Sequence, residues 1–310
     1  MSKLYPLLLA DTKEKIEQKS YSNTLTDNSL IANGFLRGNS FDEAAEAYMG
    51  NLLGDKVFRF FKGMLPYEVR LISSDKVGKV SVSPSDEEAV GRWLSLGKDR
   101  IFYILKASED ASLFLGFQKD MSAQELYELM LKGDIKSQMN ECSPEVGEIY
   151  YVKAKTPFAI GKGVEVLEIS QNSQVTLNIE ESEQFAEALD FINLSKYIPV
   201  YEIPDEESVV MDTIILSKPN IFSPSELDSF VSLFVIEGKV SISSDKFSPV
   251  ELEKQSLIIL PHDMEDVTII PQSSQCRLLR VHLKGELLSS EESIQDLEEG
   301  SKGDSHFHEC

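Results

Sequence analysis

The side chains of this 310-residue chain that could bind a metal ion, by type and spacing, lie at its C-terminal end. His306, His308 and Cys310 alternate with other residues, a spacing at which imidazole and thiolate groups can bind a metal ion. A chain end lacks the preorganisation of a dedicated site, so the sequence predicts only adventitious binding there. The other two histidines, His262 and His282, have no second histidine nearby and are interpreted as structural.

Three polar segments follow one another between apolar stretches of the chain. The first is Val80-Ser-Val-Ser-Pro84, and the second is Gly97-Lys-Asp-Arg100 before an apolar run. The third runs from Gly147 through Ala154-Lys-Thr-Pro-Phe-Ala-Ile-Gly-Lys-Gly163 to Glu168-Ile-Ser-Gln171. Gly97-Lys98 alone would be weak evidence, since a turn that enters a strand can have the same composition. The order and spacing of the three segments together carry the interpretation.

In that order and spacing the chain resembles the class I mannose-6-phosphate isomerases, which are metal-dependent double-cupin enzymes. The family reads V-Q-V-H-P-D-D, G-K-T-E-x-W-Y-I, V-P-A-G-T-x-H-A-I-G-x-G and E-I-Q-x-S-S-D-x-T-Y-R. The resemblance runs in weaker form to Leu283 and is specific between Leu65 and Ile179. It implies a mainly β fold, a double cupin of two jelly-roll β-barrels with a few helices, and many short strand-like stretches agree with it.

The departures from the family's motifs fall on its metal ligands. Ser83 stands where the family has a metal-binding His, Ser81 where it has Gln, Arg100 where it has Glu, and Phe158 where it has a second His. A hydroxyl, a guanidinium and a phenyl ring do not bind the zinc that the family uses. The family's Y-R is Leu177-Asn178, which removes an arginine suited to binding phosphate. We therefore expect vestigial metal-ligand positions, no catalytic residue and no cofactor.

Three readings of the function follow from these departures. The first is a metal-free, catalytically inactive homologue that binds a carbohydrate or sugar phosphate, or that acts as a regulatory partner of another protein. The second is a working isomerase that interconverts mannose 6-phosphate and fructose 6-phosphate in carbohydrate metabolism, either with metal ligands at other positions or with Arg100 as a fixed charge in place of the metal. The third is a structural protein without a ligand. The residues that could bind a ligand are Arg70, Lys98, Arg100 and Glu168.

The pattern predicts three helices, at residues 41–52, 122–133 and 182–192, of which the first two begin with a capping box. The predicted strands are 67–73, 79–83, 101–106, 113–117, 149–153, 164–169, 175–179, 209–216, 230–237, 239–243, 257–260, 267–270 and 277–283. We expect a first cupin module at 1–196 with helical insertions, a second at 197–285, and an acidic disordered tail at 286–310.

Charge and cysteine content limit the partners. The formal net charge is −22, with 52 acidic and 30 basic residues, which opposes binding to nucleic acid and to anionic membrane surfaces. A sugar-phosphate site would therefore need local Lys or Arg. No apolar run approaches the roughly 20 residues that span a bilayer, and three cysteines far apart favour neither a disulfide framework nor a thiolate zinc site. These features predict a cytoplasmic protein.

Overall fold

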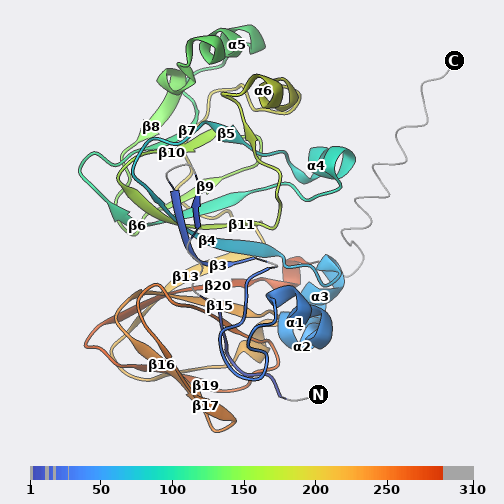
Figure 1. Cartoon of the computed structure of the whole chain (residues 1–310), viewed down its shortest axis with the longest axis vertical. Coiled ribbons are helices and arrows are strands. Elements are labelled where there is room, and N and C mark those ends of the chain that lie inside the picture. The colour runs from blue at the N-terminus through green and yellow to red at the C-terminus, as the bar shows by residue number, and fades with distance from the viewer. Residues whose placement is uncertain (1–2, 11–13, 17–18, 27, 289–310) are drawn as a thin grey trace, which may run out of the picture. The chain divides into compact units, whose positions relative to one another are not determined.

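The computed structural model describes residues 3–10, 14–16, 19–26 and 28–288. The chain divides into two compact units. Unit 1 comprises residues 1–12, 23–66 and 204–296, and unit 2 comprises residues 13–22, 67–203 and 297–310. Both are built mainly from antiparallel strands, so the mainly β class is confirmed (Figure 1).

Two sheets form the barrel that contains the candidate site, and their strands pair in an order that differs from the chain order. One runs β12 (Leu177–Asn178), β5 (Ser81–Val82), β10 (Phe158–Ile160), β7 (Leu113–Phe117), β8 (Met139–Cys142). The other runs β2 (Glu14–Ile16), β3 (Lys19–Leu25), β4 (Tyr67–Ser74), β11 (Val164–Gln171), β6 (Arg100–Ala107), β9 (Ile149–Val152). Their inner faces share one apolar core, which includes Ile72, Phe102, Ile104, Leu115 and Val166.

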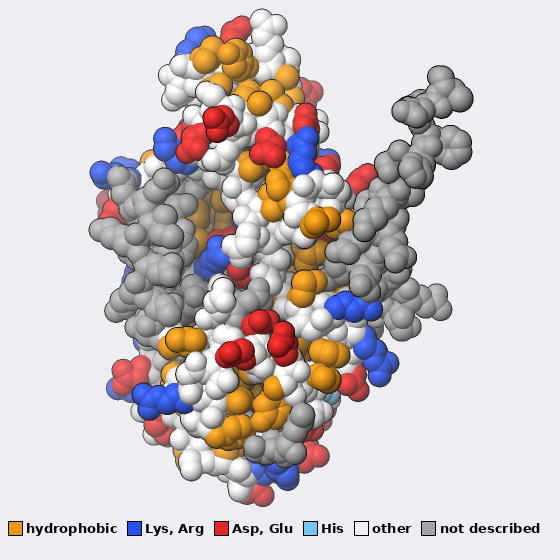
Figure 2. All heavy atoms as spheres, turned by 45° about the vertical axis from the view of Figure 1, so that its right-hand side comes forward, with side chains coloured by type: hydrophobic (Ala, Val, Ile, Leu, Met, Phe, Trp, Pro, Cys, Tyr) orange, Lys and Arg blue, Asp and Glu red, His pale blue; other side chains and the backbone are white. Residues whose placement is uncertain are grey.

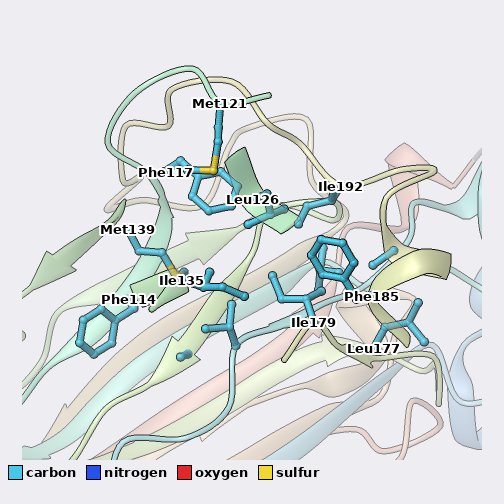
Figure 3. Packing of buried hydrophobic residues seen from close by; sticks show 14 of the residues in the cluster. Phe114, Phe117, Met121, Leu126, Ile135, Met139, Leu177, Ile179, Phe185 and Ile192 are labelled. Atoms are coloured by element: carbon cyan, nitrogen blue, oxygen red, sulfur yellow. The ribbon is translucent and has the colours of Figure 1, made fainter. Parts of the chain in front are cut away.

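Helices cover the outer face of the first of these sheets. The helices α5 (Ala123–Lys132) and α6 (Ser182–Ala188) and the short 3-10 helix η1 (Ile135–Gln138) contribute Leu126, Phe185 and Ile135 to a second apolar cluster (Figures 1 and 3). The strands contribute Val82, Phe114 and Ala159, which alternate with the residues that face the barrel interior. This sheet is therefore buried on both faces, which fixes its register.

The described part of unit 1 contains the second barrel and the helices near residues 41–61. Its sheets run β1 (Leu7–Leu8), β18 (Leu257–Leu260), β15 (Val231–Glu237), β20 (Cys276–Leu283), β13 (Val209–Leu216), and β14 (Asn220–Phe222), β19 (Val267–Pro271), β16 (Val240–Ser244), β17 (Phe247–Leu252). The short 3-10 helices are η2 (Pro224–Leu227) and η3 (Gly285–Leu287). The core between the sheets is apolar, with Leu233, Val240, Ile258 and Ile269 among its members.

The predicted helix at 41–52 is wrong in its continuity. It is interrupted at Met49, whose φ of 51° turns the chain, so that α1 (Phe41–Tyr48) and α2 (Gly50–Leu53) are separate, and α3 (Asp55–Phe61) follows Gly54. The helix predicted at 182–192 ends at Ala188. The sequence analysis missed α4 (Asp86–Trp93), although Ser85 and Glu88 form a capping box there. The strands at 113–117, 209–216 and 257–260 are confirmed with the same bounds.

Three further predictions concern membrane-spanning helices, the boundary between the modules and the C-terminal tail. Among the residues that the structure describes, no helix combines the length and apolar composition needed to cross a membrane. The boundary between modules at residues 196 and 197 stays a prediction. The predicted tail falls outside the described residues from 289 onward, and His306, His308 and Cys310 lie there.

Gly54 provides a test of the joint between α2 and α3. It has a φ of +98°, and a Cβ there would lie 2.2 Å from the carbonyl oxygen of Asp228. We expect Gly54→Ala to lower the free energy of unfolding in urea by more than about 1 kcal/mol. The control is Gly285→Ala in the same unit, where the nearest atom to an added Cβ is 3.5 Å away. Equal effects of the two substitutions would contradict this account of the joint.

Candidate functional site

The inward face of β4, β11 and β6 changes from apolar to charged along the strands. The strand alternation that points Ile72, Val166 and Phe102 into the core also points a set of polar side chains inward near the opposite end. In the strand register Glu168 lies opposite Arg70, and Ser170 lies opposite both Glu68 and Arg100. One end of the barrel interior therefore holds an ionic network in place of apolar packing.

The Arg100 guanidinium is at the centre of this network. Its Nε donates to Glu168 Oε1 at 3.1 Å, and its Nη2 donates to Ser83 Oγ at 2.9 Å and to Thr176 Oγ1 at 2.8 Å. Its Nη1 donates to the Lys98 carbonyl at 3.0 Å. The residue is 3% exposed, and this burial lowers the pKa of Arg100, while the Glu168 carboxylate opposes the shift. Every guanidinium nitrogen thus has an acceptor from the chain itself.

Phe158 supplies a flat surface for the same guanidinium. The Arg100 Cζ lies 4.4 Å from the centroid of the buried Phe158 ring, a cation–π distance. Phe158 is opposite Ser81 in the pairing of β10 with β5, and its ring lies 5.8 Å from that of Phe102. The phenyl ring therefore joins the ionic network to the apolar core.

A second ion pair centres on Glu68, which is fully buried. Lys98 Nζ donates to Glu68 Oε2 at 2.8 Å and to the Ser173 carbonyl at 2.6 Å. Arg70 Nη2 donates to Glu68 Oε1 at 2.8 Å, and Gln174 Nε2 donates to the same oxygen at 3.3 Å. Burial lowers the pKa of Lys98, and the Glu168 and Glu68 carboxylates oppose this shift.

The described members of the network differ in their exposure. Lys98 and Arg100 are 2% and 3% exposed, whereas the Arg70 side chain is 26% exposed and Gln174 and Thr176 are exposed. The Asp99 carboxylate accepts from the Ala154 N–H and from the Tyr151 hydroxyl. One arginine and two neutral polar side chains of the described network therefore reach solvent.

The donor set at this end of the barrel does not fit a divalent metal ion. Among the described residues, no group of three or more His, Cys, Asp or Glu side chains is placed to hold one. Of the four positions expected to be vestigial ligands, Ser81 and Ser83 offer hydroxyls, Phe158 offers a ring, and Arg100 offers a cation. A guanidinium has no lone pair to give and repels a second cation at close range.

The structure brings the predicted site residues together. Arg100 touches Ser83, Phe158 and Glu168 directly, while Ser81 reaches the group through its pairing with Phe158. Arg70 and Lys98 meet at Glu68. Further residues of the network were not predicted from the sequence, namely Glu68, Ser170, Ser173, Gln174 and Thr176. Glu68 had a signal, since Glu68 and Arg70 are two residues apart in a stretch that is otherwise apolar as far as Ile72, and they must share a face.

The buried pair of Arg100 and Glu168 gives a stability prediction. Arg100→Met leaves the Glu168 carboxylate without its guanidinium, which should lower the free energy of unfolding by about 3–5 kcal/mol. Adding Glu168→Gln should recover part of that loss, because the buried carboxylate charge is then gone. Urea unfolding followed by tryptophan fluorescence and circular dichroism measures both variants.

A matched control lies on the same pair of strands. Lys106 Nζ is 2.7 Å from Glu165 Oε2, but its side chain is 58% exposed. Lys106→Met should therefore change the free energy of unfolding by no more than about 1 kcal/mol. An Arg100→Met effect as small as that of the control would contradict a structural role for the buried pair.

Comparison with known proteins identifies relatives along most of the chain. No family model matches the chain. The mannose-6-phosphate isomerase ManA of Bacillus subtilis is 29% identical over 262 residues, which cover 76% of this chain and 80% of ManA. Two solved structures share the fold and each matches 90% of this chain. The first is the mannose 6-phosphate isomerase of Bacillus subtilis, with a TM-score of 0.73 and 21% sequence identity; the match covers 99% of that chain. The second is a putative mannosephosphate isomerase of Archaeoglobus fulgidus, with a TM-score of 0.76 and 17% identity; the match covers 97% of that chain. The double-cupin fold is confirmed.

Proposed function

Since this chain is a homologue of the class I mannose-6-phosphate isomerases, we propose that it is a metal-free, catalytically inactive member of that group that binds a carbohydrate or sugar phosphate. One observation carries the proposal. The Arg100 guanidinium is buried against Ser83, Phe158 and Glu168, and the first two stand where the family's motifs have metal-binding histidines.

Electrostatics supports the absence of a metal. Two unit charges 4 Å apart repel by about 4 kcal/mol at the effective dielectric constant typical of protein sites, and a divalent ion doubles this. The carboxylate that could attract a cation, Glu168, already accepts from Arg100, and Glu68 accepts from Lys98 and Arg70. A metal ion would have to displace these hydrogen bonds.

The same hydrogen bonds argue against catalysis by charge replacement. Interconversion of an aldose and a ketose needs a base and an electrophile that stabilises the developing oxygen charge. Arg100 is the obvious electrophile, but its nitrogens donate to Glu168, Ser83, Thr176 and the Lys98 carbonyl. A substrate oxygen would have to break one of these contacts to gain another, so little stabilisation would be specific to the transition state.

A carbohydrate or sugar-phosphate ligand is supported by the names of the relatives, which are mannose-6-phosphate isomerases. We further propose a cytoplasmic location, in accord with two buried free cysteines, Cys142 and Cys276. On the face that Figure 2 shows, acidic and basic side chains are interspersed and form no large basic patch, in keeping with a partner other than nucleic acid. In the regulatory form of this proposal, the chain binds another protein and regulates it.

An isomerase assay tests the proposal directly. Purified protein is supplied with mannose 6-phosphate and with zinc, manganese or cobalt, each with and without a chelator, beside Bacillus subtilis ManA as a positive control. We expect no turnover above the metal-only blank. Turnover that the chelator abolishes would reject the proposal and favour a working isomerase that interconverts mannose 6-phosphate and fructose 6-phosphate.

Reversal of the substitutions provides a positive test. The triple variant Ser83→His, Arg100→Glu, Phe158→His replaces the guanidinium, one hydroxyl and the ring with imidazole and carboxylate ligands beside Glu168. In a chain that ends at Leu288, which removes the tail histidines and Cys310, we expect this variant to bind one Co²⁺ with visible absorption bands from its coordination, while the parent of the same length shows none. A triple variant that keeps the parent's circular dichroism but gains no Co²⁺ would show that these positions do not converge as proposed.

A further inference from the structure

We propose that the charged end of the barrel has become an oxyanion site, where Arg70 and the Ser170 hydroxyl bind the phosphate or carboxylate group of a small ligand. The inference rests on the proposed absence of a metal ion there. A metal site binds a cation, whereas the proposed site binds an anion. Four observations lead to it, and they concern charge, free donors, an unpaired hydroxyl and access.

The network gathers cationic side chains. Arg70, Lys98 and Arg100 contact the two carboxylates of Glu68 and Glu168. The Asp99 carboxylate accepts from the Tyr151 hydroxyl and the Ala154 N–H, and its charge also acts on Arg100. In a chain of net charge −22, three cationic groups therefore lie together at one end of one barrel.

Arg70 has donors to spare. Its Nη2 donates to Glu68, and with the described residues it forms no other hydrogen bond or ion pair. Its side chain is 26% exposed, unlike those of Lys98 and Arg100, which are enclosed and bonded to the chain. A planar guanidinium with free N–H groups is suited to a bidentate contact with a carboxylate or phosphate.

Ser170 supplies the second donor. Its hydroxyl is buried and has no hydrogen-bond partner among the residues that the structure describes, although it lies on the inward face opposite Glu68 and Arg100. A buried polar group without a partner is rare and calls for an explanation such as a bound water or ligand. Ser170 stands where the family's motif has the longer Gln, so the substitution shortens the side chain beside the two ion pairs.

The solvent side of the network completes the argument. Gln174 is exposed and donates to the same Glu68 oxygen as Arg70, and Thr176 is exposed and accepts from Arg100. Of the three cationic side chains, Arg70 is the one that an oxyanion can reach from solvent, at 26% exposure. Lys98 and Arg100 would act on it through their charge, since their own hydrogen bonds are made within the chain.

Thermal unfolding and isothermal titration of the full chain, both in the presence of chelator, test the site with four probes: mannose 6-phosphate, glucuronate, inorganic phosphate and uncharged mannose. We expect saturable binding of at least one of the charged sugars and none of mannose. If inorganic phosphate binds as tightly as mannose 6-phosphate, the phosphate group alone is recognised. If glucuronate binds and the phosphates do not, the oxyanion is a carboxylate.

Two variants and one control decide whether the proposed residues hold the ligand. Arg70→Gln keeps a donor for Glu68 but removes the charge, and we expect about tenfold weaker binding or more. Ser170→Ala should weaken binding severalfold without lowering the unfolding temperature, since the hydroxyl has no partner to lose. Arg92→Gln, on the surface of α4 and paired with Asp190, should bind as the parent does.

Two results would contradict the proposed oxyanion site. Failure of all charged probes to bind, or binding that Arg70→Gln leaves unchanged, would overturn the oxyanion site. Because chelator is present throughout, neither result bears on metal-dependent isomerase activity. Metal-dependent turnover in the separate assay would instead reject the proposed function.

Discussion

The ion pair between Arg100 and Glu168 is the constraint on which the rest of the site depends. A guanidinium that is 3% exposed is stable only where its N–H groups meet acceptors. Ser83, Thr176 and the Lys98 carbonyl complete the set that Glu168 begins, and the Phe158 ring covers the flat face. The substitutions are therefore coupled, because a small hydroxyl at 83 and a ring at 158 suit an arginine at 100.

The second ion pair extends this arrangement toward solvent. Glu68 has no exposed surface, and Lys98, Arg70 and Gln174 donate to it from three segments of the chain. Glu68 and Glu168 lie on the neighbouring strands β4 and β11, so a shift of either strand by one residue would turn its carboxylate out of the barrel. Fold and site are specified by the same alternation of side chains, and the apolar end of the barrel holds the charged end in place.

The sequence predicted the long apolar strands, as at 113–117 and 257–260, because their composition is a local signal. It missed shorter or more polar strands, among them β8, β10, β14 and β17, and β10 contains Phe158. The continuous helix predicted across Met49 took no account of Gly50, which disfavours a helix at the point where the chain turns. Only the resemblance predicted that Ser83, Arg100 and Phe158 lie close together. Ser83 and Phe158 are 75 positions apart in the sequence, and the pairing of β5 with β10 brings their segments together. Glu68 and the unpaired hydroxyl of Ser170 needed the structure, since partner choice depends on three-dimensional distances.

The metal content of the purified, tag-free protein tests the central claim most directly. Inductively coupled plasma mass spectrometry is applied to the full chain and to a variant that ends at Leu288, which removes His306, His308 and Cys310. After incubation with zinc and removal of excess ion, the account predicts no stoichiometric metal in the shortened variant. One divalent ion per chain retained by that variant, and bound within the barrel of unit 2, would contradict the account.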